Sequence, residues 1–125
     1  MNAQGVESLL TLERGALGAA ILEPTGRQAR ILVAMLREED FLSSLHRAVY
    51  RAISRLVGHN DLPLEYVSVI AELQRMGVIE QYANGWSLVS SVGEGAVLAR
   101  PMRKRAEQLR QLAAERRQAK ECEER

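Results

Sequence analysis

The stretch EEDFLSSLHRAVYRAI, residues 38–53, decides the fold of this chain. Three adjacent acids lead into one aromatic residue and two serines, and apolar residues then recur at helical spacing. Ser43 is a good N-cap for the helix that follows, because its hydroxyl can accept a hydrogen bond from the backbone of the first turn. One face of this helix carries Leu45, Val49, Ala52, Ile53 and Leu56. The stretch therefore predicts an amphipathic helix with one buried face.

Amphipathic patterns on both sides of this stretch predict further helices. Before it, we expect helices over residues 6–21 and 28–36. After it, we expect one helix over residues 65–76 and a long one over residues 101–123, which a proline opens. The chain has only one Phe, one Trp and three Tyr in 125 residues, so its core is built mainly from Leu, Val, Ile and Ala. That composition favours helices over a β-sandwich.

Four glycines bear on how these helices pack and end. Gly15 and Gly18 lie inside the first helix, where each weakens helix propensity by about 1 kcal/mol relative to Ala. They indicate either a tolerated weakness or a place where another helix crosses closely. Gly58 is expected to adopt the left-handed conformation that ends many helices, and Gly77 is expected to end the helix before it.

The charge of the chain is divided unevenly along its length. Residues 1–99 carry 8 Lys and Arg against 11 Asp and Glu, a net charge of −3, whereas residues 100–125 carry 9 against 5, a net charge of +4. A domain that wraps nucleic acid with its body needs a basic surface there. We therefore expect nucleic acid to bind at most weakly and without sequence preference.

No set of residues supplies catalytic chemistry. Glu38, Glu39 and Asp40 are adjacent, so they do not converge on one helix face, and we interpret them as charges near the positive end of the following helix. His46 and His59 have no carboxylate at ligand spacing. No phosphate-binding loop of the form GxxxxGK[ST] is present. We predict a protein that is not an enzyme and has no cofactor and no metal site.

The single cysteine and the hydropathy pattern bear on the location of the protein. Cys122 lies in a charged run and has no partner for a disulfide, so it is interpreted as an incidental thiol. No apolar run reaches the roughly 18 residues that a membrane-spanning helix needs. The N-terminus lacks the basic start of a signal peptide. We expect a cytoplasmic protein that does not bind a membrane.

Three blocks of the chain follow one another in an order and spacing that a known family shares. They are LERGALGAAILEP at residues 12–24, EDFLSSLHRAVYRAI at residues 39–53 and PLEYVSVIAELQRMG at residues 63–77. The set resembles the N-terminal domain of DnaB-type replicative helicases, a small all-α domain that a linker joins to an ATPase domain. The C-terminal domain of bacterial primase has a similar fold. The basic helix after Pro101 resembles the first arm of the family's helical hairpin.

The resemblance implies a fold and a core. The fold is all-α, with a compact orthogonal bundle of about six helices over residues 1–99 and a long basic helix over residues 100–125. Phe41 and Tyr50 would anchor the core, and His46 would be a structural histidine near a helix start. The full set of expected core residues is Leu17, Phe41, His46, Tyr50, Ile53 and Leu73. The chain ends within the hairpin, so helicase activity is not carried over.

The resemblance also implies partners. In that family the domain forms dimers within the collar of a hexameric ring and helps to receive primase or loader proteins. It implies a non-catalytic module that docks with a replicative helicase or primase and self-associates as a dimer or ring. The expected interface residues lie on a narrow apolar stripe of the last helix, at Met102, Leu109 and Leu112. We expect residues after about 114 to project from the body, and a chain cut at Arg100 to stay folded.

A winged-helix DNA-binding regulator is the alternative function. VIAELQRMGVIEQYANGWSLV, residues 69–89, fits a recognition helix followed by a hairpin that turns at Asn84 and Gly85. The helix over residues 65–76 offers only Arg75 as a base-reading cation, and its acids repel phosphates. Residues 78–92 separate the two functions, because two small helices there favour the helicase-type domain and a hairpin favours the winged helix.

Overall fold

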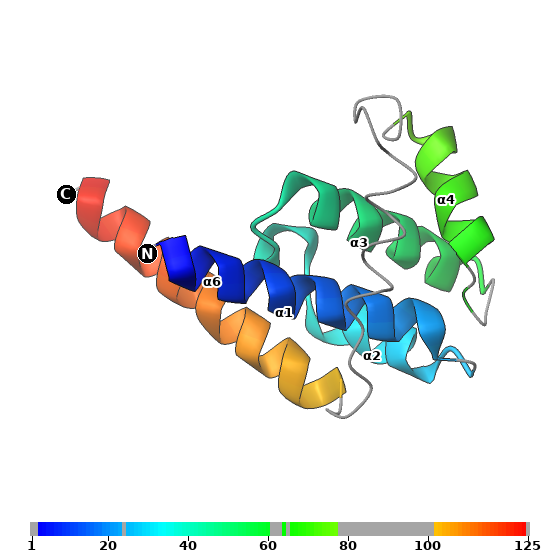
Figure 1. Ribbon diagram of the computed structural model, residues 1–125, viewed down its shortest axis with the longest axis horizontal. Coiled ribbons are helices and arrows are strands. Elements are labelled where there is room, and N and C mark those ends of the chain that lie inside the picture. The colour runs from blue at the N-terminus through cyan, green and yellow to red at the C-terminus, as the bar shows by residue number, and fades with distance from the viewer. Residues whose placement is uncertain (1–2, 24, 61–63, 65, 78–101, 125) are drawn as a thin grey trace.

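The computed structural model describes residues 3–23, 25–60, 64, 66–77 and 102–124. All regular secondary structure in these ranges is helical, which confirms the predicted all-α fold class (Figure 1). The helices are α1 (Ala3–Leu22), α2 (Arg27–Met35), the short 3₁₀ helix η1 (Glu38–Asp40), α3 (Ser44–Gly58), α4 (Tyr66–Arg75) and α6 (Met102–Glu124). Among the described residues, four α-helices and η1 precede the long helix, which is fewer than the expected number of about six.

Residues 78–92, for which two small helices or a hairpin were expected, lie outside the described residues. No helix in the described part of the chain is long and apolar enough to cross a membrane.

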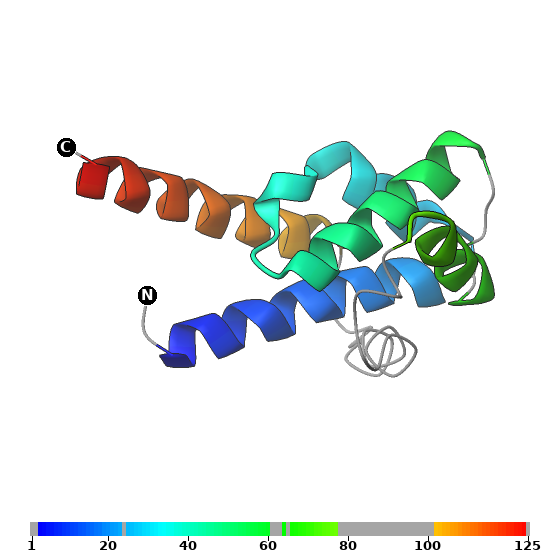
Figure 2. The ribbon, with the colours of Figure 1, turned by 90° about the horizontal axis from the view of Figure 1, so that it is seen from above.

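The helices form two groups in contact with each other: α1, α2 and α6 make one, and α3 and α4 make the other. α1 and α6 run antiparallel and side by side, and α2 packs against both (Figure 1, Figure 2). α3 packs on α1 and α2, and α4 packs on α3 at the end of the molecule away from the two termini. The first residues of α1 and the last residues of α6 therefore lie at the same end of the molecule.

The core is built around α3, as the opening stretch predicts. Ser43 caps this helix, and its hydroxyl accepts a hydrogen bond from the backbone nitrogen of His46 at 3.3 Å. The face predicted to be buried is buried at Val49, Ala52, Ile53 and Leu56 and half-buried at Leu45. Phe41 is fully buried before the helix begins, and its ring centroid lies 5.3 Å from that of Tyr50. The Tyr50 hydroxyl donates a hydrogen bond to the carbonyl of Leu36, so the aromatic pair ties α3 to the end of α2.

The two glycines of α1 lie where a second helix packs. Gly15 and Gly18 are both buried, and α6 contacts α1. The Arg105 guanidinium on α6 donates a hydrogen bond of 2.8 Å from Nη1 to the carbonyl oxygen of Gly15. A residue without a side chain lets a neighbouring backbone approach closely. α6 therefore contacts α1 at Gly15, but the contact comes from a long side chain, so the two interpretations of the glycines stay open.

The last helix contributes side chains to the core. Met102, Ala106, Leu109 and Ala113 are buried, and Arg105 between them is only 4% exposed. The division of the chain into residues 1–99 and 100–125 stays a prediction, but this burial argues that the two parts fold together.

The helix ends differ from the expectation at one position. Gly58 lies within α3 in a helical conformation, and Asn60 adopts the left-handed conformation two residues later, with a φ of 56°. The expectation for Gly58 was wrong because Asn tolerates this conformation as glycine does. Gly77, by contrast, has a φ of 75° directly after α4 and its adjoining turn, as expected of a residue that ends a helix.

Candidate functional site

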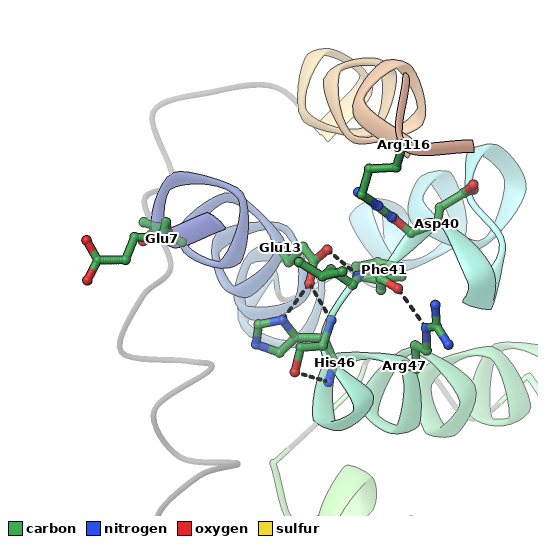
Figure 3. Close-up of polar contacts among 10 residues, drawn as sticks. Glu7, Glu13, Asp40, Phe41, His46, Arg47 and Arg116 are labelled. Atoms are coloured by element: carbon green, nitrogen blue, oxygen red, sulfur yellow. Dashed lines mark hydrogen bonds and ion pairs between the residues drawn. The ribbon is translucent and has the colours of Figure 1, made fainter. Parts of the chain in front are cut away.

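A buried carboxylate joins α1 to the start of α3. Glu13 is completely buried, and Figure 3 shows its side chain turned toward His46 and the backbone after Phe41. Its Oε2 accepts a hydrogen bond of 2.6 Å from the Leu42 backbone nitrogen, and its Oε1 accepts one of 3.4 Å from the Ser43 backbone nitrogen. His46 Nδ1 lies 2.9 Å from the same Oε1. Because a carboxylate only accepts hydrogen bonds, this places the donated proton on Nδ1.

This cluster, which we call the Glu13 junction (Glu13, Ser43 and His46), has the properties of a structural element. A buried carboxylate is destabilising unless donors surround it, and here two backbone groups and one ring nitrogen do so. His46 is only 7% exposed, and no group of three or more metal-ligating side chains occurs in the described part of the chain. The carboxylate partner of His46 could not be predicted from the sequence, because Glu13 precedes it by 33 residues.

A second polar cluster joins η1 to α6. Asp40 is only 4% exposed. Its Oδ2 accepts a hydrogen bond of 2.8 Å from the Arg37 backbone nitrogen, and its Oδ1 accepts one of 2.7 Å from Arg117 Nη2. The Asp40 backbone carbonyl accepts a further hydrogen bond of 3.1 Å from Arg116 Nη2. The expectation that residues after about 114 project freely is therefore wrong as far as Arg117, because η1 holds the helix there.

The three adjacent acids have separate partners. Glu38 forms an ion pair with Arg51, Glu39 lies 4.0 Å from Arg37, and Asp40 binds Arg117. They form η1 itself, which precedes the start of α3 at Ser44, and their interpretation as charges near the positive end of α3 stays a prediction.

Two ionisable groups near η1 are shifted by their surroundings. The Arg51 guanidinium, which hydrogen-bonds Glu38, lowers the pKa of that carboxyl below its usual value. Burial raises the pKa of the Tyr50 hydroxyl to about 12, and the nearby negative charge of Asp40 acts in the same direction. Tyr50 therefore remains a neutral hydrogen-bond donor to the Leu36 carbonyl at physiological pH.

The structure places the predicted core residues together. Leu17, Phe41, Ile53 and Leu73 are fully buried, and His46 and Tyr50 are exposed by 7% and 6%. These six residues come from α1, α3, α4 and the segment between η1 and α3.

The predicted interface residues lie mostly inside the chain. Met102 is 1% exposed and Leu109 is completely buried, both against the chain's own core. Leu112 is half-buried and packs at the edge of that core. Of the three, only Leu112 presents surface to a partner in this conformation. The large apolar side chains that the structure shows as exposed lie elsewhere, at Leu22, Leu42 and Val67.

The helix assigned to DNA reading in the alternative function has its cation engaged. Arg75 Nη1 donates a hydrogen bond of 2.8 Å to Glu72 Oε2, and Arg55 Nη1 on α3 lies 3.4 Å from Glu72 Oε1. Glu72 is only 5% exposed. Through Arg55 this network joins α4 to α3, and it pairs Arg75, whose side chain is 73% exposed, with an acid of the same helix.

Comparison with known proteins gives one family and one solved fold. The sequence pattern of the family described as "DnaB-like helicase N terminal domain" matches residues 6–111. Among solved structures, the chain is similar to the N-terminal domain of DnaB helicase from Mycobacterium tuberculosis, with 26% sequence identity and a TM-score of 0.78. That similarity covers 89% of this chain and 78% of the other. No curated protein sequence matches the chain.

Proposed function

Because the chain belongs to the DnaB-like helicase N-terminal domain family, we propose that it is a non-catalytic docking and assembly module of the replication apparatus. Its partner is a replicative helicase or primase, and it self-associates as a dimer or ring. The expected cytoplasmic location is part of this proposal. Nucleic acid binds it at most weakly and without sequence preference.

The observation that carries the proposal is the family match over residues 6–111, which spans α1 to α4 and the first half of α6. The agreement in fold with a DnaB N-terminal domain supports it independently of the sequence pattern. The two clusters of polar side chains described above also support a role without catalysis, because the Glu13 junction and Asp40 have their hydrogen bonds satisfied within the protein.

The docking surface differs from the one expected from sequence. Met102 and Leu109 are buried in the core of the chain, so they are not available to a partner. Contacts with a partner fall instead on the outer face of α6 near Leu112 and on exposed apolar side chains such as Val67, which is 75% exposed.

A binding experiment tests the partner. The immobilised protein is expected to capture purified replicative helicase or primase at moderate salt. Fluorescence anisotropy with labelled duplexes is expected to show weak binding that is equal for different sequences and is lost as salt rises. Tight binding to one duplex sequence that persists at high salt and disappears in Arg75→Ala would overturn the proposal in favour of the winged-helix regulator.

A mass measurement tests the assembly. Light scattering at increasing concentration is expected to give a mass that is a multiple of the 13.9 kDa chain. A mass equal to one chain at all concentrations would contradict self-association while leaving docking intact.

A further inference from the structure

A basic pocket lies where η1, α3 and α6 meet. Its volume is about 260 Å³, and its lining residues are Glu39, Arg47, Ala113, Arg116, Arg117 and Lys120. Four of the six are cations and one is an acid, whereas the whole chain has a net charge of only +1. Figure 3 shows Arg47 and Arg116 on either side of the segment that contains Asp40 and Phe41. Positive charge is therefore concentrated at a concave place on the surface.

The cations of this pocket have unused hydrogen-bond donors. Arg116 donates to the Asp40 carbonyl through Nη2, but its Nη1 is buried and has no hydrogen-bond partner among the described residues. Arg47 donates one hydrogen bond of 2.7 Å from Nε to the Phe41 carbonyl, and its two terminal guanidinium nitrogens form no hydrogen bond with the described residues. A charged donor that is buried without an acceptor is unfavourable, and an anionic group would pair with Arg116 Nη1 once that side chain turns toward the pocket. Arg47 and Lys120 are exposed and meet such a group directly.

We propose that the basic pocket binds the carboxylate of an acidic side chain from a partner protein. The inference rests on the proposed docking function and names the chemistry of one contact. A carboxylate has two oxygens in one plane, and a guanidinium presents two parallel N–H groups that match them. Arg47 and Arg116 supply such groups from two different elements, and Lys120 adds a third positive charge at the rim.

The surroundings favour a single carboxylate over a nucleic-acid strand. Glu39 forms part of the wall, and Asp40 binds Arg117 beside it. These negative charges repel a strand that carries one phosphate per nucleotide more strongly than they repel one side chain. Sites for single-stranded nucleic acid also combine a groove of cations with aromatic side chains on which bases stack. None of the described residues that line this pocket is aromatic.

The test is a titration of the full chain at low salt with a labelled decapeptide that has one glutamate among serines, set against the same peptide with glutamine in its place. The double variant Arg116→Gln/Lys120→Gln removes two positive charges from the pocket. The double variant Arg103→Gln/Arg110→Gln removes the same charge from exposed positions of the same helix outside the pocket. Losing charged hydrogen bonds predicts binding weaker by about tenfold or more in the first variant. The second variant is expected to lose less than about threefold, as exposed charges contribute little.

Three further measurements complete the test. Backbone amide resonances of the wild-type chain are expected to shift around Arg47 and Arg116 and to stay in place around Arg103. Arg116→Lys keeps the charge but loses the paired donors, so it is expected to bind the peptide less tightly than the wild type. Thermal melting of each variant checks that the fold is intact. If the double glutamine variant is destabilised, the comparison between Arg116→Lys and the wild type still tests the pocket.

Several results would overturn the inference. Equal weakening in the two double variants means that net charge alone attracts the peptide. Absence of peptide binding to the wild type at low salt would show that the pocket does not bind a carboxylate. Tighter binding of a decathymidine strand, sensitive only to the pocket variant, means that the ligand is nucleic acid and not a carboxylate.

The inference and the proposed function fail in different ways. If helicase or primase is captured equally by the wild type and the pocket variant and the peptide does not bind, docking stands and the pocket has no part in it. If the peptide binds in the pocket but neither protein is captured, the site stands and the proposed partners are wrong.

Discussion

α3 and α6 both bury one face in the same core, but their sequences show this very differently. On α3, large apolar residues recur at helical spacing between polar ones, and the buried face can be read directly. On α6, most residues are charged or polar, and the buried face consists of Met102, Arg105, Ala106, Leu109 and Ala113. Small residues and the stem of an arginine complete that face. A helix can therefore belong to a core with little apolar content of its own, when the neighbouring helix supplies the larger side chains.

The strongest test of this comparison removes α6. A chain that ends at Arg100 loses two large buried side chains and the hydrogen bond from Arg105 to Gly15. Each large-to-small change in a core costs about 2–5 kcal/mol, and domains of this size have about 5–15 kcal/mol of stability in total. From the sequence alone we expected a chain cut at Arg100 to stay folded. Because α6 contributes buried side chains to the core, we expect instead that the truncated chain loses cooperative thermal unfolding, measured by circular dichroism.

The control for this experiment is a chain that ends at Gln118, which keeps the hydrogen bonds of Arg116 and Arg117 to Asp40. Its melting temperature should change little. If the chain that ends at Arg100 melts cooperatively at the wild-type temperature, residues 1–99 are an independent domain and α6 is an appendage.

The second test weakens the core packing around α3. Phe41→Ala removes the largest fully buried side chain among the described residues and its contact with Tyr50. The cavity is expected to lower the free energy of unfolding by about 3–5 kcal/mol, measured by urea titration. Leu42→Ala is the control, since the neighbouring side chain is partly exposed. Equal effects from the two substitutions would mean that Phe41 is not a core residue.

The third test concerns the Glu13 junction. Glu13→Gln replaces one accepting oxygen by a donating amide, which then faces a donor. We expect a loss of about 1–3 kcal/mol in the free energy of unfolding. Glu7→Gln on the same helix is the matched control, because Figure 3 shows Glu7 pointing away from the cluster and its side chain is exposed. An unchanged stability in Glu13→Gln would show that the junction does not hold α1 to α3.

The smallest effect is expected from the surface pair of Glu38 and Arg51. The pKa of Glu38 is lowered in the folded state. The ion pair therefore stabilises the fold fully above the unfolded-state pKa of about 4.3, and this stabilisation is lost as the pH falls through the folded-state pKa. Arg51→Ala should lower stability by at most about 1 kcal/mol at pH 7, because water screens the pair. The difference from the wild type should shrink as pH falls below 4. In urea titrations across this pH range, a difference that stays constant would contradict the role of the ion pair.

The sequence predicted those parts of the fold that depend on neighbouring residues. Ser43 and the apolar spacing after it are enough to begin and orient α3, and both act within a few residues of each other. The family resemblance, carried by three such local blocks, gave the architecture and is confirmed.

The candidate sites could not be predicted in the same way, because they depend on contacts between distant segments. Glu13 meets His46 across 33 residues, and Asp40 meets Arg117 across 77. Neither pair has a spacing that any helix or turn imposes. The basic pocket has the same origin, since Arg47 and Arg116 become neighbours only after α6 packs against η1.

The antiparallel course of α1 and α6 has a mechanical consequence. Both ends of the chain leave the molecule on the same side, so tension applied to the two termini would peel these helices apart one contact at a time. Contacts that are loaded in succession yield at lower force than contacts that are loaded together. Optical-tweezers pulling from the two termini should therefore show α6 separating from α1 at low force before the rest of the fold opens, and a single step at high force would contradict this geometry.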